Sequence, residues 1–374
     1  MSGKNRPIAV FVSFSGTGGV ERMVVSLIRG FVDLGRAVDL VLVRAQSPHL
    51  ERLPPEVNVV RLKTDHTFLA LPALARYLRE RRPAALLAAK DRAGRAAVLA
   101  RRLAGTDTPI LMRLGTNLST AMADKSPPER WLRYLPIRWL YPKVDQIVAV
   151  SEGVAEDTAT VAHMPRDRIR VIRNPVITPE LMDLAAEPCP HPWFEQGQPP
   201  VILGAGRFQR QKDFPTLIRS FARIREQRPS RLVILGEGGG REGLQRLIAE
   251  LDLGEDVDLP GFQRNPFPFV ARAALFVLSS AWEGSPNVLT EAMALGTPVV
   301  STDCPSGPRE LLDGGRFGPL VPVGDVEALA RAMAETLDRR LSPETLKAAV
   351  ADYNQAKSAH HYLEALGVPS PTTS

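Results

Sequence analysis

Residues 278–312 read LSSAWEGSPNVLTEAMALGTPVVSTDCPSGPRELL, and the predicted fold rests first on this segment. It opens at the end of an apolar strand, 275–278, and a second short strand, 298–301, closes it. Between the two strands the sequence predicts a helix, because Pro286 suits a first helical position and Gly296 is a good C-terminal stop. Strand, helix and strand in this order form the repeating unit of a parallel α/β sheet.

Two glutamates, Glu283 and Glu291, stand eight positions apart in this stretch. Glu283 lies just before the predicted helix, and Glu291 lies one to two turns into it. The N–H groups of Asn287, Val288 and Leu289 would form an anion site at the positive end of the helix dipole. Because carboxylates accept hydrogen bonds from pairs of sugar hydroxyls, the pattern favours a phosphorylated sugar or nucleoside. Two surface glutamates on an ordinary strand–helix corner would give the same spacing.

A segment earlier in the chain, PVILGAGRFQRQKDFPTLIRSF at 200–221, places two cations after another predicted strand. Its apolar start is followed by a glycine turn, and Arg207 and Lys212 precede an amphipathic helix. Two cations held at the end of a glycine-bearing strand can clamp a diphosphate, since charge-assisted hydrogen bonds to phosphate are strong.

Four segments in this half of the chain resemble family 4 of the retaining glycosyltransferases. They are GRFQRQKDFPTLI (206–218), LGEGGGREGL (235–244), GFQRNPFPFVARAALFVLSS (261–280) and EGSPNVLTEAMALGTPVVSTDCPSGPRE (283–310). The Glu-x7-Glu spacing is the signature of that family. The resemblance implies the GT-B fold, in which two doubly wound, Rossmann-like α/β domains face each other across a cleft.

The resemblance also implies roles for individual residues. Gly236 joins Arg207 and Lys212 as contacts of a nucleotide-sugar donor. Glu291 would bind the ribose hydroxyls, and Glu283 the hydroxyls of the donor sugar. Glu283, Arg207 and Lys212 form the implied catalytic set, in which the cations stabilise the departing diphosphate and Glu283 orients and polarises the sugar.

The implied reaction is a retaining hexosyl transfer by front-face attack, in which the leaving phosphate accepts the proton of the acceptor. UDP is the commonest donor nucleotide of the family. The sequence looks most like members that use glycan or lipid-linked acceptors to build bacterial surface polysaccharide, lipopolysaccharide or glycolipid. The one Asp-x-Asp, Asp256 to Asp258, falls at the start of a strand, the wrong end for the cleft, and argues against a manganese-dependent transferase. We therefore expect no metal and no cofactor, the nucleotide-sugar being a co-substrate.

Two other classes of protein remain open. A nucleotide-sugar epimerase shares the two-domain fold but usually relies on acids and histidines, and of the six histidines only His163 falls near a motif. Isotope exchange without an acceptor would support the epimerase. A catalytically inactive nucleotide-sugar-binding protein would have a broken glutamate pair or cation clamp, whereas both are intact here.

Both halves of the chain alternate predicted strands with helices, which indicates parallel sheets covered on both faces. Strands are predicted at 8–13, 38–43, 57–62, 84–89, 110–113 and 146–150, and then from 201, 232, 257, 275 and 298. We expect an acceptor-binding domain at 1–180, a proline-rich linker at 181–199, a nucleotide-sugar-binding domain at 200–350, and a C-terminal helix and tail at 351–374. In the family, helical sequence here (345–366) crosses back to brace the first domain.

A glycine-rich loop, SGTGGVE at 15–21, follows the first predicted strand. Glycines let a ligand approach the backbone and leave N–H groups for an anion. Glu21 stands where a dinucleotide fingerprint would have its third glycine, which excludes that motif. The family carries a similar loop near the donor phosphates and the acceptor, which implies donor contacts for Gly18 and Gly19 and an acceptor-side contact for Gly16. A plain tight turn is the alternative.

The segment RLGTNLS, 113–119, ends another predicted strand and is expected to point into the same cleft. Arg113 and Asn117 are therefore candidate acceptor-side residues. Many family members place a histidine hereabouts, but this chain has Gly115 and no histidine nearby, which weakens any transfer of sugar specificity. Asn117 could replace one hydrogen bond, or it could cap a turn.

Positive charge is concentrated in the first half of the chain. Residues 1–185 carry 28 Lys+Arg against 18 Asp+Glu, a net of +10, and the remainder carries 19 against 23, a net of −4. The excess suits an anionic partner such as phospholipid headgroups, a lipid-linked diphosphate or nucleic acid. Of these partners we expect no nucleic acid. Arginine-rich codon use would give the same excess. The segment PERWLRYLPIRWLYP, 128–142, interleaves aromatics with arginines as a bilayer interface does, although core packing is the commoner explanation.

The N-terminus has one short apolar run and no stretch reaches about 18 apolar residues, so neither a signal peptide nor a membrane span is predicted. Two cysteines are too few for a disulfide framework, and reduced thiols suit the cytoplasm. We expect a cytoplasmic protein that associates peripherally with the inner face of the membrane.

Overall fold

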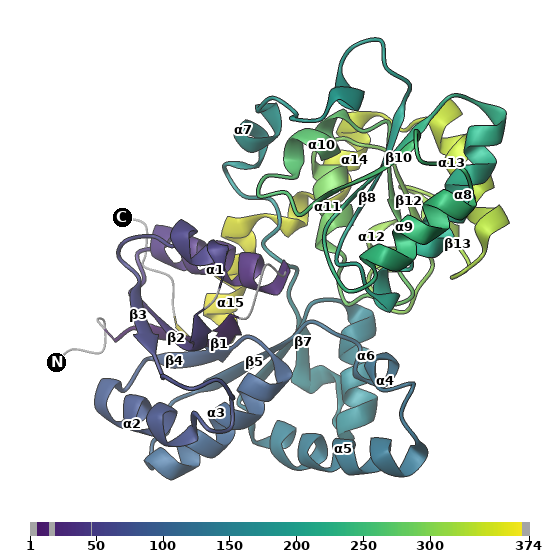
Figure 1. Cartoon of the computed structure of the whole chain (residues 1–374). Coiled ribbons are helices and arrows are strands. Elements are labelled where there is room, and N and C mark those ends of the chain that lie inside the picture. The colour runs from purple at the N-terminus through teal and green to yellow at the C-terminus, as the bar shows by residue number, and fades with distance from the viewer. Residues whose placement is uncertain (1–5, 15–18, 46, 369–374) are drawn as a thin grey trace. The chain divides into compact units, whose positions relative to one another are not determined.

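The computed structural model describes residues 6–14, 19–45 and 47–368, and the chain divides into two compact units. Unit 1 comprises residues 1–176 and 353–374, and unit 2 comprises residues 177–352. Each unit contains one sheet, and every strand pair described in either sheet is parallel (Figure 1). The predicted α/β class with two parallel, helix-covered sheets is confirmed.

The sheet of unit 1 has the strand order β3-β2-β1-β4-β5-β6-β7. Its strands are β1 (Ile8–Phe14), β2 (Val38–Ala45), β3 (Asn58–Arg61), β4 (Ala85–Ala88), β5 (Ile110–Leu114), β6 (Gln146–Ala149) and β7 (Ile169–Val171). Its helices are α1 (Gly19–Asp33), α2 (Leu71–Arg81), α3 (Asp91–Ala104), α4 (Leu118–Ala121), α5 (Pro127–Leu140), α6 (Glu152–Ala162) and, from the C-terminus, α15 (Gln355–Ala365). Apolar runs fill these strands because both faces of a parallel sheet are buried. Two cores result, one on each face.

Helix α15 belongs to unit 1 although it lies near the end of the chain. It packs along α1, as the adjacent yellow and purple helices in Figure 1 show. A Cβ added to Gly30 of α1 would lie 2.7 Å from the Cβ of Ala359, so the two helices approach closely there. Ser26 Oγ also donates to Gln355 Oε1 at 3.0 Å.

The sheet of unit 2 has the order β10-β9-β8-β11-β12-β13. Its strands are β8 (Val201–Ala205), β9 (Arg231–Leu235), β10 (Val257–Gly261), β11 (Leu275–Leu278), β12 (Val299–Thr302) and β13 (Leu320–Val321). Its helices are α7 (Leu181–Ala186), α8 (Phe214–Gln227), α9 (Arg241–Glu250), α10 (Phe267–Arg272), α11 (Asn287–Ala294), α12 (Pro308–Leu311), α13 (Val326–Asp338) and α14 (Pro343–Ala349).

The order of strands reverses once in each sheet. In unit 1 the chain builds β1 to β3 outward on one side and then resumes with β4 on the other side of β1. In unit 2 the same reversal falls between β8 and β11. Ligands of doubly wound sheets bind at the carboxyl ends of the two strands flanking such a switch point, so these two places are where sites are expected.

Two segments differ from the sequence-based expectation. The stretch predicted as a linker, 181–199, contains α7, which packs on α10 within unit 2. The predicted helix at 345–366 is interrupted at 351–353, so that α14 stays with unit 2 and only α15 joins unit 1.

Candidate active site

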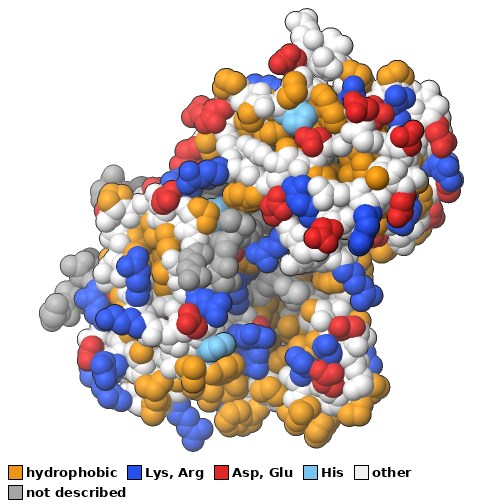
Figure 2. Space-filling model, in the orientation of Figure 1, with side chains coloured by type: hydrophobic (Ala, Val, Ile, Leu, Met, Phe, Trp, Pro, Cys, Tyr) orange, Lys and Arg blue, Asp and Glu red, His pale blue; other side chains and the backbone are white. Residues whose placement is uncertain are grey.

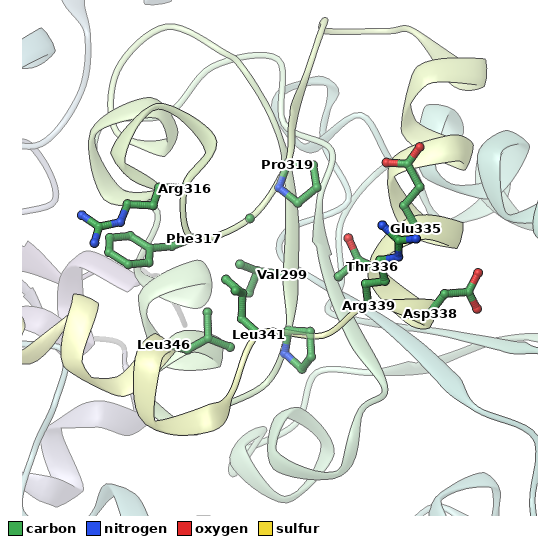
Figure 3. Close-up of a pocket in the computed structure, with 12 residues that line it drawn as sticks. Val299, Arg316, Phe317, Pro319, Glu335, Thr336, Asp338, Arg339, Leu341 and Leu346 are labelled. Atoms are coloured by element: carbon green, nitrogen blue, oxygen red, sulfur yellow. The ribbon is translucent and has the colours of Figure 1, made fainter.

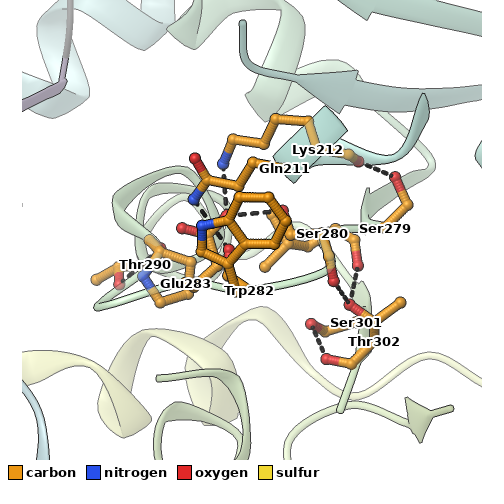
Figure 4. Close-up of polar contacts among 11 residues, drawn as sticks. Gln211, Lys212, Ser279, Ser280, Trp282, Glu283, Thr290, Ser301 and Thr302 are labelled. Atoms are coloured by element: carbon orange, nitrogen blue, oxygen red, sulfur yellow. Dashed lines mark hydrogen bonds and ion pairs between the residues drawn. The ribbon is translucent and has the colours of Figure 1, made fainter. Parts of the chain in front are cut away.

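The switch point of unit 2 brings together Lys212 and Glu283, two of the three predicted catalytic residues. Lys212 Nζ lies 2.6 Å from Glu283 Oε1, and the side chains are only 16% and 8% exposed. Ser280 Oγ donates to the same carboxylate oxygen at 2.6 Å (Figure 4). The sequence predicts both charged residues but not their pairing, and it does not predict Ser280, whose position two residues after an apolar strand was the available signal.

Hydrogen bonds from neighbouring side chains to main-chain carbonyl oxygens hold the loops that carry this cluster. Ser279 Oγ donates to Lys212 O at 2.8 Å, and Thr302 Oγ1 donates to Ser280 O at 2.6 Å. Gln211 Nε2 donates to Trp282 O at 2.9 Å. Figure 4 shows these residues converging from the loop after β8, the loop after β11 and the end of β12. The ion pair is therefore held by three neighbouring strand ends.

The third predicted catalytic residue, Arg207, is exposed on the loop that follows β8. Among the residues that the structure describes, none forms a hydrogen bond or ion pair with its guanidinium. Gly236 shapes the backbone beside this loop, because a Cβ there would lie 1.9 Å from Gly206 O and the φ of +139° disfavours other residues. Arg207 is thus presented to solvent on a tightly packed glycine-bearing turn.

Helix α11 follows the cluster and carries the second glutamate. Glu291 is buried in its second turn, and its predicted contact with ribose hydroxyls stays a prediction. The Leu289 N–H donates to Pro286 O at 3.0 Å, and the predicted donor contact of Leu289 stays a prediction. The predicted contacts of Asn287 and Val288 stay a prediction.

Cys304 is a buried thiol next to the ion pair. Burial, with a smaller contribution from the negative charge of Glu283, raises its pKa to about 12. The thiol therefore stays protonated at neutral pH, and it packs against the cluster as a small apolar side chain rather than acting as a nucleophile.

The predicted acceptor-side residues have structural partners in unit 1. Arg113 is buried and donates from Nη2 to Asn174 Oδ1 at 2.9 Å, and burial lowers its pKa. Asn117 caps α4, because its Oδ1 accepts from Thr120 N at 3.1 Å, which is the turn-capping alternative. Contact of either side chain with an acceptor stays a prediction.

The glycine loop is only partly described. Gly19 begins α1 and is exposed, whereas the predicted contacts of Gly16 and Gly18 lie outside the described residues.

A second lysine–glutamate pair, which sequence reasoning missed, occupies the switch point of unit 1. Lys90 follows β4, and Glu21 lies in the first turn of α1. Lys90 Nζ is 3.3 Å from Glu21 Oε1 and 3.1 Å from Ser13 O at the end of β1. A lysine directly after an apolar strand was the only signal, and it is a common arrangement.

The predicted position of the Asp-x-Asp at the amino end of β10 is confirmed, and both carboxylates have structural partners. Asp256 bonds Arg225 at 2.7 Å and Arg231 at 3.0 Å, and Asp258 Oδ2 lies 2.9 Å from His191 Nε2. Within the described ranges, no group of three or more His, Cys, Asp or Glu side chains is placed to hold a metal ion.

A cavity of about 670 Å³ also lies in unit 2, but on the opposite edge of the sheet from Glu283. Figure 3 shows Val299 and Pro319, at the amino ends of β12 and β13, between Phe317 on one side and the end of α13 on the other. Since the predicted donor residues follow the carboxyl ends of the strands, this cavity is not their site.

Helix α5 presents an apolar face to solvent. Trp131 and Trp139 are 57% and 56% exposed, so core packing is wrong for both, and Leu132 and Leu135 are exposed beside them. Figure 2 shows hydrophobic side chains with interspersed Lys and Arg along the lower edge of unit 1, where α5 lies. Tyr141, by contrast, is buried and donates to Asp91 Oδ1 at 2.8 Å. In the part of the chain described, no helix is both long and apolar enough to span a bilayer.

Comparison with known proteins matches both units. Residues 17–179 match the family described as Glycosyltransferase Family 4, and residues 199–339 match Glycosyl transferases group 1. A Methanocaldococcus jannaschii protein named as an uncharacterized glycosyltransferase is 36% identical over 182 residues, which are 48% of this chain and 44% of that protein.

Two further matches extend over nearly the whole chain. The Campylobacter jejuni N-acetylgalactosamine-N,N'-diacetylbacillosaminyl-diphospho-undecaprenol 4-alpha-N-acetylgalactosaminyltransferase is 31% identical over 344 residues, 88% of this chain and 90% of that protein. The structure of Anabaena Alr3699/HepE in complex with UDP aligns with a TM-score of 0.74 at 19% identity, over 96% of this chain and 99% of that one. The fold of this chain is therefore shared with that structure.

Proposed function

The chain belongs to glycosyltransferase family 4, with the GT-B fold, and we propose that it is a retaining enzyme that moves a sugar from a UDP-sugar to a lipid-linked or glycan acceptor. The observation that carries the proposal is the pre-formed cluster of Lys212, Glu283 and Ser280 at the switch point, with Arg207 exposed on the loop that also carries Lys212. The Campylobacter relative, whose name includes a diphospho-undecaprenol-linked sugar, supports a polyprenyl-diphosphate-linked acceptor. The role in surface polysaccharide synthesis is the one that the sequence resemblance implies. The UDP in the HepE structure makes UDP-sugars the first donors to test.

In this proposal the cations stabilise the departing diphosphate. Lys212 uses one of its three N–H groups on Glu283, which leaves donors for phosphate oxygens. Arg207, which has no described protein partner, offers a planar fork for the same group. Charge placed in advance where negative charge develops lowers the barrier without reorganisation.

The bonds exchange on one face of the sugar. The anomeric carbon–oxygen bond to the β-phosphate breaks, the acceptor oxygen forms a bond on the same face, and the leaving phosphate takes the acceptor's proton. Glu283 orients the donor sugar by accepting hydrogen bonds from the sugar hydroxyls. Its Oε1 accepts from Lys212 and Ser280, so in this scheme its Oε2 contacts the sugar. No step in this scheme needs a metal ion.

The test uses the purified full-length protein with UDP-glucose, UDP-galactose and their N-acetyl forms, and a synthetic polyprenyl-diphosphate-linked monosaccharide. We expect transfer in the presence of EDTA and an α-linked product from the α-linked donor, measured by NMR. An inverted product, or activity that EDTA abolishes and Mn²⁺ restores, would overturn the mechanism.

We also propose that unit 1 associates with an anionic membrane surface on the cytoplasmic side through α5. The exposed face of Trp131, Leu132, Leu135 and Trp139 supports this, because amphipathic helices with aromatic and basic residues lie in the bilayer interface. Lys143 Nζ lies 3.5 Å from the centre of the Trp139 ring, so cation and aromatic are presented together.

A further inference from the structure

Gln211 joins the loop that carries Lys212 to the segment that leads into Glu283. Its main-chain oxygen accepts from the N–H of Ala281 at 2.7 Å, and its side-chain Nε2 donates to the main-chain oxygen of Trp282 at 2.9 Å. Figure 4 draws this side-chain hydrogen bond together with the Lys212–Glu283 ion pair. Main-chain groups of both residues before Glu283 are therefore bound to one residue that is not a member of the ion pair.

We infer that Gln211 is a positioning residue of the proposed transfer reaction. By holding the segment 281–282, it places the Glu283 carboxylate beside the Lys212 ammonium. The catalytic part of this inference rests on the proposed function, because Glu283 orients the donor sugar only in a transferase. The structural part rests on the hydrogen bonds of Gln211 alone.

The peptide group between Trp282 and Glu283 shows why the side chain of Gln211 matters. Its carbonyl oxygen accepts from Gln211 Nε2 at 2.9 Å, and its N–H donates to Pro305 O at 3.2 Å. Among the hydrogen bonds of the described residues, loss of the Gln211 amide would leave this group with the longer bond alone. Because Glu283 Oε1 lies only 2.6 Å from Lys212 Nζ, a shift of this peptide group would lengthen that contact.

Lys212 is held by contacts that do not involve the Gln211 side chain. Its main-chain oxygen accepts from Ser279 Oγ at 2.8 Å. Its side chain lies against Gly206, where an added Cβ would come within 2.8 Å of Lys212 Cε. Loss of the Gln211 amide should therefore displace the glutamate rather than the lysine, and it should leave the binding of a diphosphate intact.

The test compares Gln211→Met with Gln209→Met in the full-length chain. Methionine is about as long as glutamine but has no N–H donor. Gln209 is the matched control, because it is exposed on the same loop and its side chain forms no hydrogen bond with the residues that the structure describes. With a UDP-sugar and the synthetic polyprenyl-diphosphate-linked monosaccharide, we expect Gln211→Met to lower kcat by about three- to tenfold. The Kd of UDP, measured by calorimetry, should stay at the wild-type value, and Gln209→Met should match the wild type in both quantities.

The same two variants in a Glu283→Ala background separate positioning from a general structural effect. If Gln211 acts through the Glu283 carboxylate, Gln211→Met should cause no further loss of kcat once that carboxylate is absent. A loss by the same factor in both backgrounds overturns the inference. A wild-type kcat in the single variant overturns it as well, and so does a weakening of UDP binding by the factor that kcat loses.

Hydrogen exchange keeps this inference distinct from the proposed function. Amides of the segment 281–284 should exchange faster in Gln211→Met than in the wild type or Gln209→Met, because a hydrogen bond that restrains the segment is lost. If the wild type transfers no sugar, the proposed function fails, and exchange then decides the structural part. Faster exchange confined to this segment supports the holding of Glu283 by Gln211, whereas unchanged exchange overturns it.

Discussion

The two sheets carry the same pair of residue types at the same topological position, but in different states of order. At the switch point of unit 2 the Lys212–Glu283 contact is 2.6 Å and both side chains are nearly buried. At the switch point of unit 1 the Lys90–Glu21 contact is 3.3 Å and the lysine is exposed to about a third. The switch point of a doubly wound sheet is thus the same in both units, and the loops around it determine how closely and how deeply its ion pair is packed.

The short, buried contact of the Lys212–Glu283 pair corresponds to the work that this pair is proposed to do. A departing diphosphate develops charge in the transition state, and only groups fixed beforehand stabilise it without cost of reorganisation. Serine hydroxyls on both sides of the unit 2 cluster, Ser279 and Ser280, provide that fixation.

The largest effect is expected from Glu283→Ala. It leaves the Lys212 ammonium and the Ser280 hydroxyl without their shared acceptor, and it removes the proposed contact with the donor sugar. Loss of one fixed transition-state contact costs about 10²- to 10³-fold in kcat. Initial-rate kinetics should show this loss, while calorimetry should show binding of free UDP close to that of the wild type.

Glu291→Ala is the matched variant, since it removes the second glutamate of the motif. We expect it to weaken UDP binding, and Glu291→Gln to do so by a smaller factor because shape is kept. If Glu283→Ala weakens UDP as much as Glu291→Ala does, the division of roles between the glutamates is wrong.

The sheets could be predicted because buried parallel strands have apolar sequences, separated by residues typical of turns. The exceptions are β7 (Ile169–Val171) and β13 (Leu320–Val321), edge strands too short to show a pattern. The pairing of Lys212 with Glu283 could not be predicted, because the two residues are 71 positions apart. At that separation the chain offers many other lysine–glutamate combinations, and the sequence does not tell them apart. Long-range contacts of this kind depend on packing that no local pattern records.

The exposed face of α5 shows a different limit. Trp131, Leu135 and Trp139 repeat every four residues, and Ile137 and Leu140 lie three apart on another stripe. Both stripes are apolar, so helical periodicity cannot tell which of them faces the core. Packing decides the matter, because Ile137 and Leu140 are buried and the tryptophans are not.

The next largest effect is expected from Arg207→Ala, which tests whether the switch point of unit 2 binds a diphosphate. If Arg207 holds the diphosphate, UDP affinity should fall by about tenfold or more, from the loss of charged hydrogen bonds worth about 1.5–3 kcal/mol. The loss should shrink as salt is raised, because the side chain is exposed. Calorimetry measures both quantities, and Arg210→Ala on the same loop is the control. Equal affinity in the two variants would remove Arg207 from the clamp.

A smaller effect, on stability alone, is expected from Asp39→Asn at the amino edge of the first sheet. Burial tends to raise the pKa of Asp39, but hydrogen bonds from Arg81, Asn58 and Tyr77 outweigh it and lower the pKa. Stability from a lowered pKa is present at neutral pH and is lost as pH falls below the unfolded value of about 4. We expect the variant to lose about 1–3 kcal/mol at pH 7 and progressively less below pH 4, by denaturant unfolding.

Donor and acceptor KM are the control for Asp39→Asn. Both should be unchanged, because the carboxylate lies at the edge of the sheet opposite the switch point. A change in either KM would mean that the two edges of the sheet are not independent.

The smallest effect is expected from Trp131→Ala combined with Trp139→Ala. Binding of the wild type to anionic vesicles should be reversible and should fall with salt, since each Lys or Arg near the surface contributes about 1 kcal/mol and screening acts within about 8 Å at physiological salt. The double variant should lose the salt-resistant part and bind several-fold more weakly in a sedimentation assay. Because both tryptophans are more than half exposed, its melting temperature should match the wild type.

The control for this pair comes from the other unit. Leu251 and Leu341 are exposed large apolar side chains of unit 2, and their double alanine variant should bind vesicles as the wild type does. Equal losses in both double variants would mean that vesicle binding is a general property of exposed apolar side chains rather than of α5. Absence of binding to strongly anionic vesicles at low salt would exclude the membrane association and leave a glycosyltransferase acting away from the bilayer surface.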